Sequence, residues 1–489
     1  MQLNKLISQL KPLEVINFDE NNNIEINDIS YNSKTTKSGD IFVCLVGEKT
    51  DGHKFAKMAE EKGAVAIMAQ QKIDGLNIPI LLVKDTQKTI ADLAGILFEF
   101  PSKKLNLIGI TGTNGKTTVT HLIERIFEYN QKNCGLIGTL GYKLSSDDVY
   151  KDAKHTTPQA PELQRTFNIM LENKIENVAM EVSSHALAQN RVGACEFNCA
   201  VLTNLTQDHL DYHITMQNYF EAKAILFKNL KAGSIAIINN DDARAKDFIA
   251  CTNKEIKILT YGIEKDADVK ASNINFTSTG ANFDCKTPLG AYKINLQMTG
   301  MFSIYNVLAA LTTAIGQNLD IETSIKALEQ TKGVAGRFEA ITNNPLTIVD
   351  YAHTPDGLEN VLIAARKILS KNGKLICIFG CGGDRDATKR PQMGAISEKY
   401  ADITIISSDN PRSEDPQQII TDILSGIKSL NPEKIMVEPD RELAIKLAAQ
   451  LAQKDDLVLV AGKGHEDYQI LKDETIHFDD REEVRKYFG

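Results

Sequence analysis

The sequence predicts an α/β protein of three domains. Two observations support this prediction: strand-like and helix-like segments alternate along most of the chain, and 489 residues are too many for a single hydrophobic core. We expect the domains to span residues 1–100, 101–333 and 334–489.

The first domain is expected to be a small α/β unit. Apolar runs over 40–46 and 78–83 predict strands, and helical patterns are present over 54–62 and 86–98. The segment Pro101-Ser102-Lys103-Lys104 has the composition of a linker, so we place the first boundary there.

The second domain opens with a glycine-rich loop that predicts a nucleotide triphosphate site. An apolar run over 105–110 indicates a buried strand, and apolar residues from Val119 onward at helical spacing indicate a helix. Glycines between them would let backbone N–H groups surround phosphate oxygens, while Lys116 contacts the outer phosphates and Thr117 binds magnesium. The strict motif has glycine where this chain has Ile110, and an ordinary glycine-rich turn is the alternative. Strand, loop, Lys-Thr and helix together favour a P-loop ATPase-like domain whose candidate ATP ligands are Gly112, Thr113, Asn114, Gly115, Lys116, Thr117 and Thr118.

The remainder of the second domain predicts a mostly parallel sheet with strands over 178–182 and 200–203 and an antiparallel edge over 269–296. Glu181 lies at a strand end, which suits a second magnesium ligand, although a solvated carboxylate is the commoner role. His209 could bind metal as a neutral imidazole, and a hydrogen-bonding turn explains it equally well. Lys223 lies in a helical run, where a lone lysine is normally exposed.

The third domain is predicted to be a doubly wound, Rossmann-like sheet. Arg385, Arg412 and Glu466 follow three different strands, and ligands of such sheets bind beyond the carboxyl ends of the strands. Two arginines and a carboxylate suit a ligand that carries carboxylates and an ammonium group, although each could be a surface charge. The glycine-rich turn at 380–386 lacks the spacing of a dinucleotide motif, so it indicates an NAD site only weakly. The predicted strands are 347–351, 374–379, 403–407, 434–437 and 457–461.

The composition is that of an ordinary globular protein: 42% of residues are hydrophobic and the formal net charge is −9 at pH 7. This charge argues against a nucleic-acid or membrane binder, and no apolar run reaches the roughly 18 residues of a membrane-spanning helix. Eight cysteines without a C-x-x-C pair indicate free thiols in a reducing compartment. Lys5, Lys11 and Glu14 interrupt the start of the chain, so we expect no signal peptide and a cytoplasmic location. We also expect a monomer.

Several motifs, in their order along the chain, make nearly the whole sequence resemble the Mur ligase family, which builds the peptide stem of bacterial cell walls. The resemblance implies an amide ligase of peptidoglycan precursor synthesis that uses ATP and Mg²⁺. The motifs are Thr111-Gly112-Thr113-Asn114-Gly115-Lys116-Thr117, Glu181-Val182-Ser183-Ser184-His185, Asp208-His209, Ala222-Lys223 and Tyr351-Ala352-His353.

Within that family, the turn Asp409-Asn410-Pro411-Arg412 is associated with meso-diaminopimelate. The implied reaction therefore adds meso-diaminopimelate to UDP-N-acetylmuramoyl-L-alanyl-D-glutamate through an acyl phosphate. Arg412 can pair with the carboxylate that diaminopimelate carries and lysine lacks.

The resemblance also implies roles that the local patterns leave open. Lys223 would carry a carbamate and share the second magnesium ion with Glu181 and His209, while Thr117 holds the first. Lys116, Glu181, His209 and Lys223 are the implied catalytic residues, and Asn306, Arg337 and His353 are further nucleotide contacts. The muramoyl-dipeptide contacts are Ser33, His53, Thr156, Thr157, Ser183, Gln189 and Arg191, and the diaminopimelate contacts are Arg385, Asp409, Asn410, Arg412, Gly462 and Glu466. This chain departs from the family at Asn32-Ser33-Lys34, where Asp-Ser-Arg is usual, and at Ser303, where asparagine is usual.

Three other interpretations remain open: a ligase that adds lysine, a ligase that adds glutamate to folate, and a nucleotide-binding regulator without ligase activity. The Asp-Asn-Pro-Arg turn and the muramoyl-type motifs argue against the first two. The presence of all four implied catalytic residues argues against the third.

Overall fold

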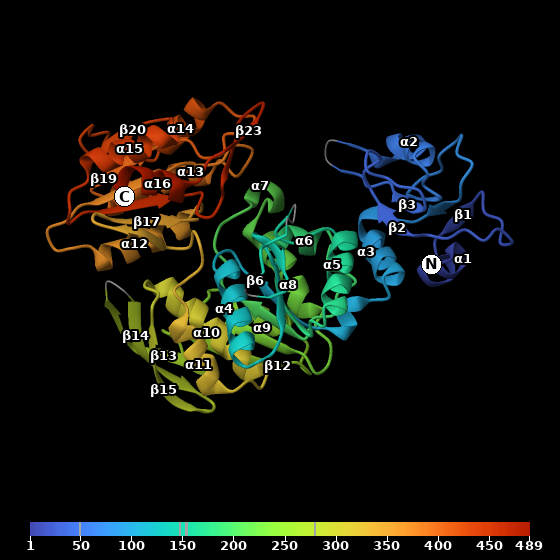
Figure 1. Ribbon diagram of the computed structural model, residues 1–489, viewed down its shortest axis with the longest axis horizontal. Helices are drawn as coiled ribbons and strands as arrows, with labels where there is room; N and C mark the ends of the chain where they lie inside the picture. The colour runs from blue at the N-terminus through green and yellow to red at the C-terminus, as the bar shows by residue number, and fades with distance from the viewer. Residues whose placement is uncertain (48–49, 146–147, 152–154, 278–279) are drawn as a thin grey trace.

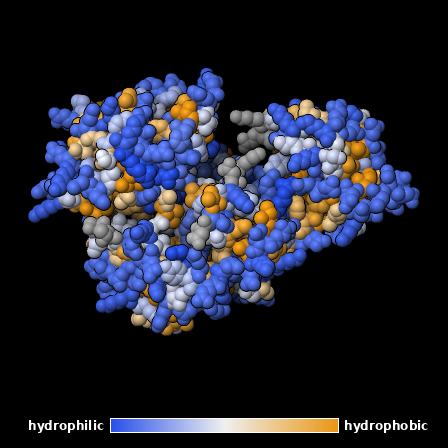
Figure 2. All heavy atoms as spheres, in the orientation of Figure 1, coloured by the Kyte–Doolittle hydropathy of each residue, from blue (hydrophilic) through white to orange (hydrophobic). Residues whose placement is uncertain are grey.

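The computed structural model describes residues 1–47, 50–145, 148–151, 155–277 and 280–489, which form three lobes in chain order (Figure 1). Each lobe is built around its own mixed sheet, so the predicted three-domain α/β class is confirmed. The boundaries after residues 100 and 333 stay predictions. Figure 2 shows a notch between the first and third lobes above the central one.

The first lobe holds a five-stranded sheet in the order β1-β5-β4-β3-β2, in which only β1 is antiparallel to its neighbour. The segment 101–104, predicted as a linker, instead forms the 3-10 helix η2 (Pro101–Lys104), and Pro101 and Ser102 are buried. The chain therefore enters the central lobe through a packed turn. The elements are α1 (Leu3–Leu10), β1 (Glu14–Ile16), β2 (Asp28–Ser30), β3 (Asp40–Val43), η1 (Gly52–Phe55), α2 (Ala56–Glu61), β4 (Ala66–Ala69), β5 (Ile80–Leu82) and α3 (Thr86–Leu97).

The central lobe holds a ten-stranded sheet in the order β15-β14-β13-β12-β11-β10-β6-β9-β7-β8. The strands from β13 to β7 run parallel, while the predicted antiparallel edge is the meander β13-β14-β15 and β8 turns back beside β7. The strands are β6 (Asn106–Thr111), β7 (Cys134–Gly138), β8 (Gly141–Lys143), β9 (Asn177–Glu181), β10 (Cys199–Leu202), β11 (Ile235–Asn239), β12 (Lys257–Gly262), β13 (Val269–Thr277), β14 (Gly280–Thr287) and β15 (Gly290–Leu296). The helices are α4 (Lys116–Tyr129), α5 (Ala160–Glu172), α6 (Ser184–Ala188), α7 (Leu210–His213), α8 (Met216–Lys228), α9 (Ala245–Cys251), α10 (Met301–Gly316) and α11 (Ile321–Gln330).

Strand β6 lies in the middle of the parallel part, between β10 and β9. The carboxyl ends of parallel strands meet at one edge of a sheet. The loop after β6, Glu181 at the end of β9 and the turn after β10 therefore lie together, and this edge faces the third lobe.

The third lobe holds a six-stranded sheet in the order β16-β17-β21-β18-β19-β20, parallel except for β16. All five strands predicted from the sequence are present. The strands are β16 (Glu339–Asn343), β17 (Leu346–Asp350), β18 (Leu375–Phe379), β19 (Ile403–Ile406), β20 (Ile435–Val437), β21 (Leu457–Ala461), and the separate pair β22 (Tyr468–Ile470) and β23 (Thr475–His477). The helices are α12 (Pro355–Ile368), α13 (Lys389–Tyr400), α14 (Pro416–Leu424), α15 (Arg441–Leu451) and α16 (Asp480–Phe488).

Polar contacts join the lobes. Arg165 of α5 donates in two-pronged fashion to Asp28 of the first lobe, with N–O distances of 2.7 to 3.0 Å. Asn114, in the loop before α4, donates to Asp356 of α12 at 2.8 Å, so the third lobe contacts the glycine-rich loop directly. Among the described residues, no helix is both long and apolar enough to cross a membrane.

Candidate active site

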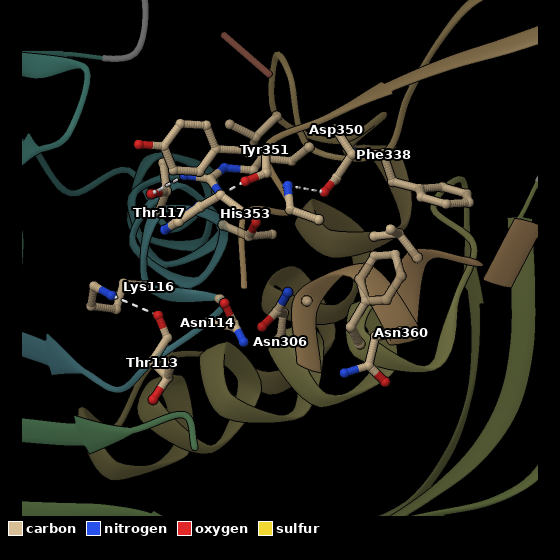
Figure 3. A pocket seen from close by; sticks show the side chains of 18 of the residues that line it. Thr113, Asn114, Lys116, Thr117, Asn306, Phe338, Asp350, Tyr351, His353 and Asn360 are labelled. Carbon is tan, nitrogen blue, oxygen red and sulfur yellow. Dashed lines mark hydrogen bonds between the residues drawn. The ribbon is translucent and has the colours of Figure 1, made fainter. Parts of the chain in front are cut away.

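A cavity of about 1450 Å³ lies between the central and third lobes. The glycine-rich loop, the ends of β9 and β10 and the start of α10 line one side. The turns after β17, β18, β19 and β21 line the other. Figure 3 shows Lys116 and Thr117, from the start of α4, and Tyr351 and His353, from the third lobe, among the side chains that line the cavity.

The glycine-rich loop runs from the end of β6 to the start of α4. Gly112 and Gly115 have φ values of +151° and +85°, which favour glycine. An added Cβ would lie 1.8 Å from Thr203 Oγ1 at Gly112 and 2.4 Å from Asn306 Oδ1 at Gly115. Side chains are therefore excluded at these two positions, and the backbone N–H groups at the start of α4 can approach an anion closely.

Lys116, the first residue of α4, is half-buried. Its ammonium group donates to the carbonyls of Gly112 at 3.0 Å and Thr113 at 2.9 Å. Burial lowers the pKa of Lys116, although the carboxylates of Glu181 and Asp208 oppose the shift. This positive group over the loop suits binding of a polyphosphate.

Glu181, at the end of β9, is only 1% exposed, which excludes the solvated role that its sequence context allowed. Its carboxylate accepts from Thr117 Oγ1 at 3.1 Å, from Thr139 N at 2.9 Å and from Thr139 Oγ1 at 3.2 Å. Thr117, in the first turn of α4, and Glu181 are thus in direct contact. Both are predicted magnesium ligands.

The turn after β10 brings Asp208 and His209 to the same edge. Burial lowers the pKa of His209 to about 3, with Asp208 opposing the shift, so the imidazole is neutral at pH 7 and able to bind a metal ion. Asp208 is buried, yet its electrostatic interactions with His209, His353 and Lys389 hold its pKa below the ordinary value against the effect of burial. The ring of His185 lies 4.7 Å from that of His209, centroid to centroid.

Lys223, on α8, is 1% exposed and so does not lie on the exposed helix face that its sequence context suggests. Its amine donates to the carbonyl of Gly112 at 2.7 Å and lies 4.5 Å from the centroid of the Tyr219 ring. Burial and then the charge of Lys116 lower the pKa of Lys223 well below its ordinary value. A neutral amine is the form that reacts with carbon dioxide to give a carbamate.

Asn306, Arg337 and His353 line the cavity beside the loop. Arg337 Nη2 donates to Thr117 Oγ1 at 2.9 Å, and its guanidinium lies over the ring of Tyr351. Arg337 Nε is buried and has no hydrogen-bond partner among the described residues. Burial lowers the pKa of His353 to about 4.

The candidate amino-acid residues gather at the other end of the cavity. Asn410 donates to Glu466 Oε2 at 2.9 Å, which links the turns after β19 and β21. Arg412 donates from Nη1 to the carbonyl of Gly383 at 2.8 Å, and burial followed by the charge of Arg385 lowers its pKa. Arg385, Asp409, Asn410, Arg412, Gly462 and Glu466 all line the cavity.

The residues implied for the muramoyl dipeptide divide into two groups. Thr157 donates to the carbonyl of Glu181 at 2.8 Å and to Ser183 Oγ at 3.3 Å, and Arg191 donates to the carbonyl of Thr157 at 2.9 Å and to Gln189 Oε1 at 2.7 Å. Together with Thr156, whose hydroxyl lies 3.2 Å from that of Thr139, these residues form one cluster beside Glu181, a candidate metal ligand.

Ser33 and His53 belong to the first lobe and do not line the cavity. The ring of His53 is engaged within that lobe, since Nε2 accepts from Gln70 N at 3.0 Å and Nδ1 contacts Asp51 Oδ1 at 2.6 Å.

Sequence reasoning missed Asp208 and Lys463 as site residues. Lys463 is fully buried beneath the amino-acid end and lies 3.3 Å from Asn410 Oδ1, 3.5 Å from Glu466 Oε2 and 3.7 Å from Asp409 Oδ1. Its position in Gly462-Lys463-Gly464-His465-Glu466, directly after a strand, was the available signal. No group of three or more His, Cys, Asp or Glu side chains able to hold a metal ion is present in the part of the chain that the structure describes.

Three family models match the chain in succession: "Mur ligase family, catalytic domain" over residues 25–94, "Mur ligase middle domain" over 110–314 and "Mur ligase, glutamate ligase domain" over 336–464. The chain belongs to the Mur ligase family, as its motifs predicted.

Its relatives point to one branch of the family. The chain is 44% identical to the UDP-N-acetylmuramoyl-L-alanyl-D-glutamate–2,6-diaminopimelate ligase of Listeria monocytogenes, over 99% of this chain and 98% of the relative. It is also 44% identical to the protein of the same name from Bacillus cereus, with the same coverage. A solved structure of a protein with this name superimposes with a TM-score of 0.67 at 34% identity, covering 94% of each chain.

Proposed function

We propose that this protein is an ATP-dependent ligase that joins meso-diaminopimelate to UDP-N-acetylmuramoyl-L-alanyl-D-glutamate in peptidoglycan precursor synthesis. The observation that carries the proposal is the single cavity between two lobes. At one end are the phosphate loop and Glu181, and at the other is the Asp-Asn-Pro-Arg turn with Arg412. Full-length relatedness to ligases named for this reaction supports it.

The residues present fit a magnesium nucleotide. The loop excludes side chains at Gly112 and Gly115, and the buried Arg337 Nε is available to a ligand. Thr117 would hold one magnesium ion, and Glu181, His209 and carbamylated Lys223 a second. Bound magnesium would supply positive charge that screens the phosphates. The carbamate would add the oxygen ligands that Mg²⁺ prefers.

The chemistry must activate a carboxylate, because an oxide is too poor a leaving group for direct attack by an amine. Transfer of the terminal phosphoryl group of ATP to the D-glutamate side chain forms an acyl phosphate and releases ADP. The amine of diaminopimelate then attacks the acyl carbon. The new C–N bond forms, the ammonium proton is lost, and the C–O bond to phosphate breaks.

The protein's residues contribute charge and position to this sequence. Lys116 and Arg337 supply positive charge where the phosphoryl group transfers. The cluster of Thr157, Ser183 and Arg191 would orient the dipeptide carboxylate beside Glu181. We further propose that the third lobe rotates against the central one to exclude water from the acyl phosphate.

Amino-acid selectivity is assigned to Arg412. A fork from arginine to carboxylate contributes about 1.5–3 kcal/mol, or one to two decades in selection. Lysine lacks that carboxylate and would leave the guanidinium unpaired. Both of the hydrogen bonds that the Arg412 side chain makes to described residues use Nη1, so Nη2 and Nε remain for a ligand.

The test is phosphate release with ATP, magnesium and UDP-N-acetylmuramoyl-L-alanyl-D-glutamate, in the presence of meso-diaminopimelate, L-lysine or no amino acid. Turnover confined to diaminopimelate, with that preference lost in Arg412→Ala, is the expected result. Arg366→Ala is the matched control, because Arg366 lies at the opposite edge of the same sheet and pairs with Asp402. Equal turnover with lysine would remove the role of Arg412. Turnover with no amino acid would favour a nucleotide-binding regulator.

The proposal extends to the setting of the enzyme. A UDP-linked precursor and ATP are both cytoplasmic metabolites, so we propose a cytoplasmic enzyme. We propose that it acts as a monomer and binds neither nucleic acid nor membrane, in line with its net charge of −9.

A further inference from the structure

A fully buried ion pair lies behind the amino-acid end of the cavity and does not line it. Arg441 begins α15 and Asp480 begins α16, and both side chains are 0% exposed. Arg441 Nε donates to Asp480 Oδ1 and Nη2 to Oδ2, each at 2.7 Å. This two-pronged geometry fixes the plane of the guanidinium.

The same guanidinium also binds two backbone carbonyls. Nη2 donates to the carbonyl of Ala461 at 2.9 Å and Nη1 to that of Ser408 at 3.3 Å. These carbonyls immediately precede Gly462 and Asp409. One side chain therefore holds the backbone immediately before two of the turns that carry candidate amino-acid ligands, 409–412 and 462–466.

Sheet pairing does not join these two turns directly. The strand order is β17-β21-β18-β19, so β18 separates β21 from β19. The two turns nevertheless lie close together. A Cβ added to Gly462 would be only 2.9 Å from Asp409 Oδ2. Asn410 and Glu466, one on each turn, are in hydrogen-bond contact at 2.9 Å.

We propose that Arg441, held by Asp480, is a positioning residue that sets the distance between the turns 409–412 and 462–466 and thereby the affinity for the amino acid. The proposal deepens the proposed ligase function and rests on it. Arginine suits the task because its planar fork reaches a carboxylate and two carbonyls at once, which a lysine cannot do. A buried ion pair is weak evidence for stability, since apolar side chains of similar volume often stabilise as well.

The decisive variant is therefore Arg441→Met/Asp480→Leu, which removes both charges together and leaves neither partner buried alone. We expect it to fold with a melting temperature close to that of the unmodified protein. We expect the KM for meso-diaminopimelate to rise about tenfold, as for the loss of one charge-assisted hydrogen bond, while the KM for ATP stays within about twofold.

The matched control is Arg366→Met/Asp402→Leu. This pair also joins an arginine to an aspartate in the third lobe, at 2.7 Å, and Asp402 accepts from the N–H of Leu375, at the start of β18. It therefore lies at the opposite edge of the sheet, and we expect no change in the KM for meso-diaminopimelate. Should the Arg441 double variant not fold, Arg441→Lys keeps the charge opposite Asp480 and is expected to raise the same KM.

Hydrogen exchange without substrates gives a readout independent of turnover. Faster amide exchange over 407–413 and 461–467 than in the control, with the rest of the lobe unchanged, would support the proposal. Unchanged exchange in both turns, or equal rises in KM for ATP and the amino acid, would overturn it. If the unmodified protein shows no amino-acid-dependent turnover, the ligase function fails, and the exchange measurement still decides whether Arg441 positions the turns.

Discussion

Replacing Lys223 by methionine separates the stability of the protein from its activity. Lys223 is 1% exposed, and among the described residues its amine donates to the carbonyl of Gly112, at 2.7 Å. Methionine fills a similar volume without the amine. Losing the hydrogen bond costs about 0.5–1.5 kcal/mol, and removing a buried amine offsets that cost. We expect Lys223→Met to be at least as stable as the unmodified protein at neutral pH.

The pH dependence follows from the lowered pKa of Lys223. Between its folded pKa and the ordinary value of 10.5, the unfolded chain binds one more proton than the folded protein. The stability of the unmodified protein therefore rises with pH in that window, by up to about 1.4 kcal/mol per pH unit. Lys223→Met lacks this contribution, so its advantage in chemical denaturation should shrink as the pH rises from the folded pKa of Lys223 toward 10.5.

The same substitution, Lys223→Met, should lower turnover although it does not lower stability. Methionine cannot form a carbamate, and loss of a direct magnesium ligand should lower phosphate release by about 100-fold or more, since outer residues alone are worth 10–100-fold. Lys228→Met, on the exposed face of the same helix, is the control and should change neither property. A pH-independent stability difference would mean that Lys223 is charged in the folded protein. Turnover above about a third of the unmodified rate would remove its role as a ligand.

Three further predictions concern single side chains. Glu181→Gln keeps the shape but removes the charge, and we expect phosphate release to fall about 100-fold with little change in melting temperature; an unchanged rate would sink the metal-ligand role. Asp356→Ala removes the bond from Asn114, so the KM for ATP should rise several-fold, and an equal rise for every substrate would contradict this reasoning. Ile214 follows α7 with φ +68° and is 71% exposed, at the centre of a three-residue turn in which Thr215 N donates to His213 O at 2.8 Å. Relief of that strain should make Ile214→Gly more stable by about 1 kcal/mol in chemical denaturation, whereas Leu430→Gly, at a site 62% exposed and without positive φ, should lose stability.

The fold was predictable because its signals are local. Each strand of the third lobe that was expected from an apolar run is present, since strands buried on both faces are continuous apolar segments. The segment 101–104 was predicted as a linker from its composition, which does not show that it forms a 3-10 helix or that Ser102 is buried and donates to the carbonyl of Ala194 at 3.2 Å. Amino-acid composition indicates whether a segment tends to be exposed to solvent, but it does not show which distant residues pack against that segment.

The site was predictable only where one turn holds several functional groups. The association of the Asp-Asn-Pro-Arg turn with diaminopimelate came from the family resemblance, whereas the glycine-rich loop indicates phosphate binding over a few residues. Lys223 has no such local signal, because its environment depends on the carbonyl of Gly112, which lies 111 residues earlier in the chain. Its sequence neighbours indicate an exposed helical lysine, and only the family resemblance suggested otherwise.

The role of Arg441 is even harder to predict from its sequence neighbours than that of Lys223. The sequence shows an arginine at the start of a helix, and nothing nearby reveals that it meets Asp480 and two strand ends. Residues that contact a ligand often lie in a turn whose sequence indicates its function. A residue that fixes the distance between two turns is recognised only from its contacts with separate strands and helices. Selectivity for the amino acid should depend on both kinds, so a variant that keeps every residue of the cavity wall and loses only the Arg441–Asp480 pair should still bind diaminopimelate poorly.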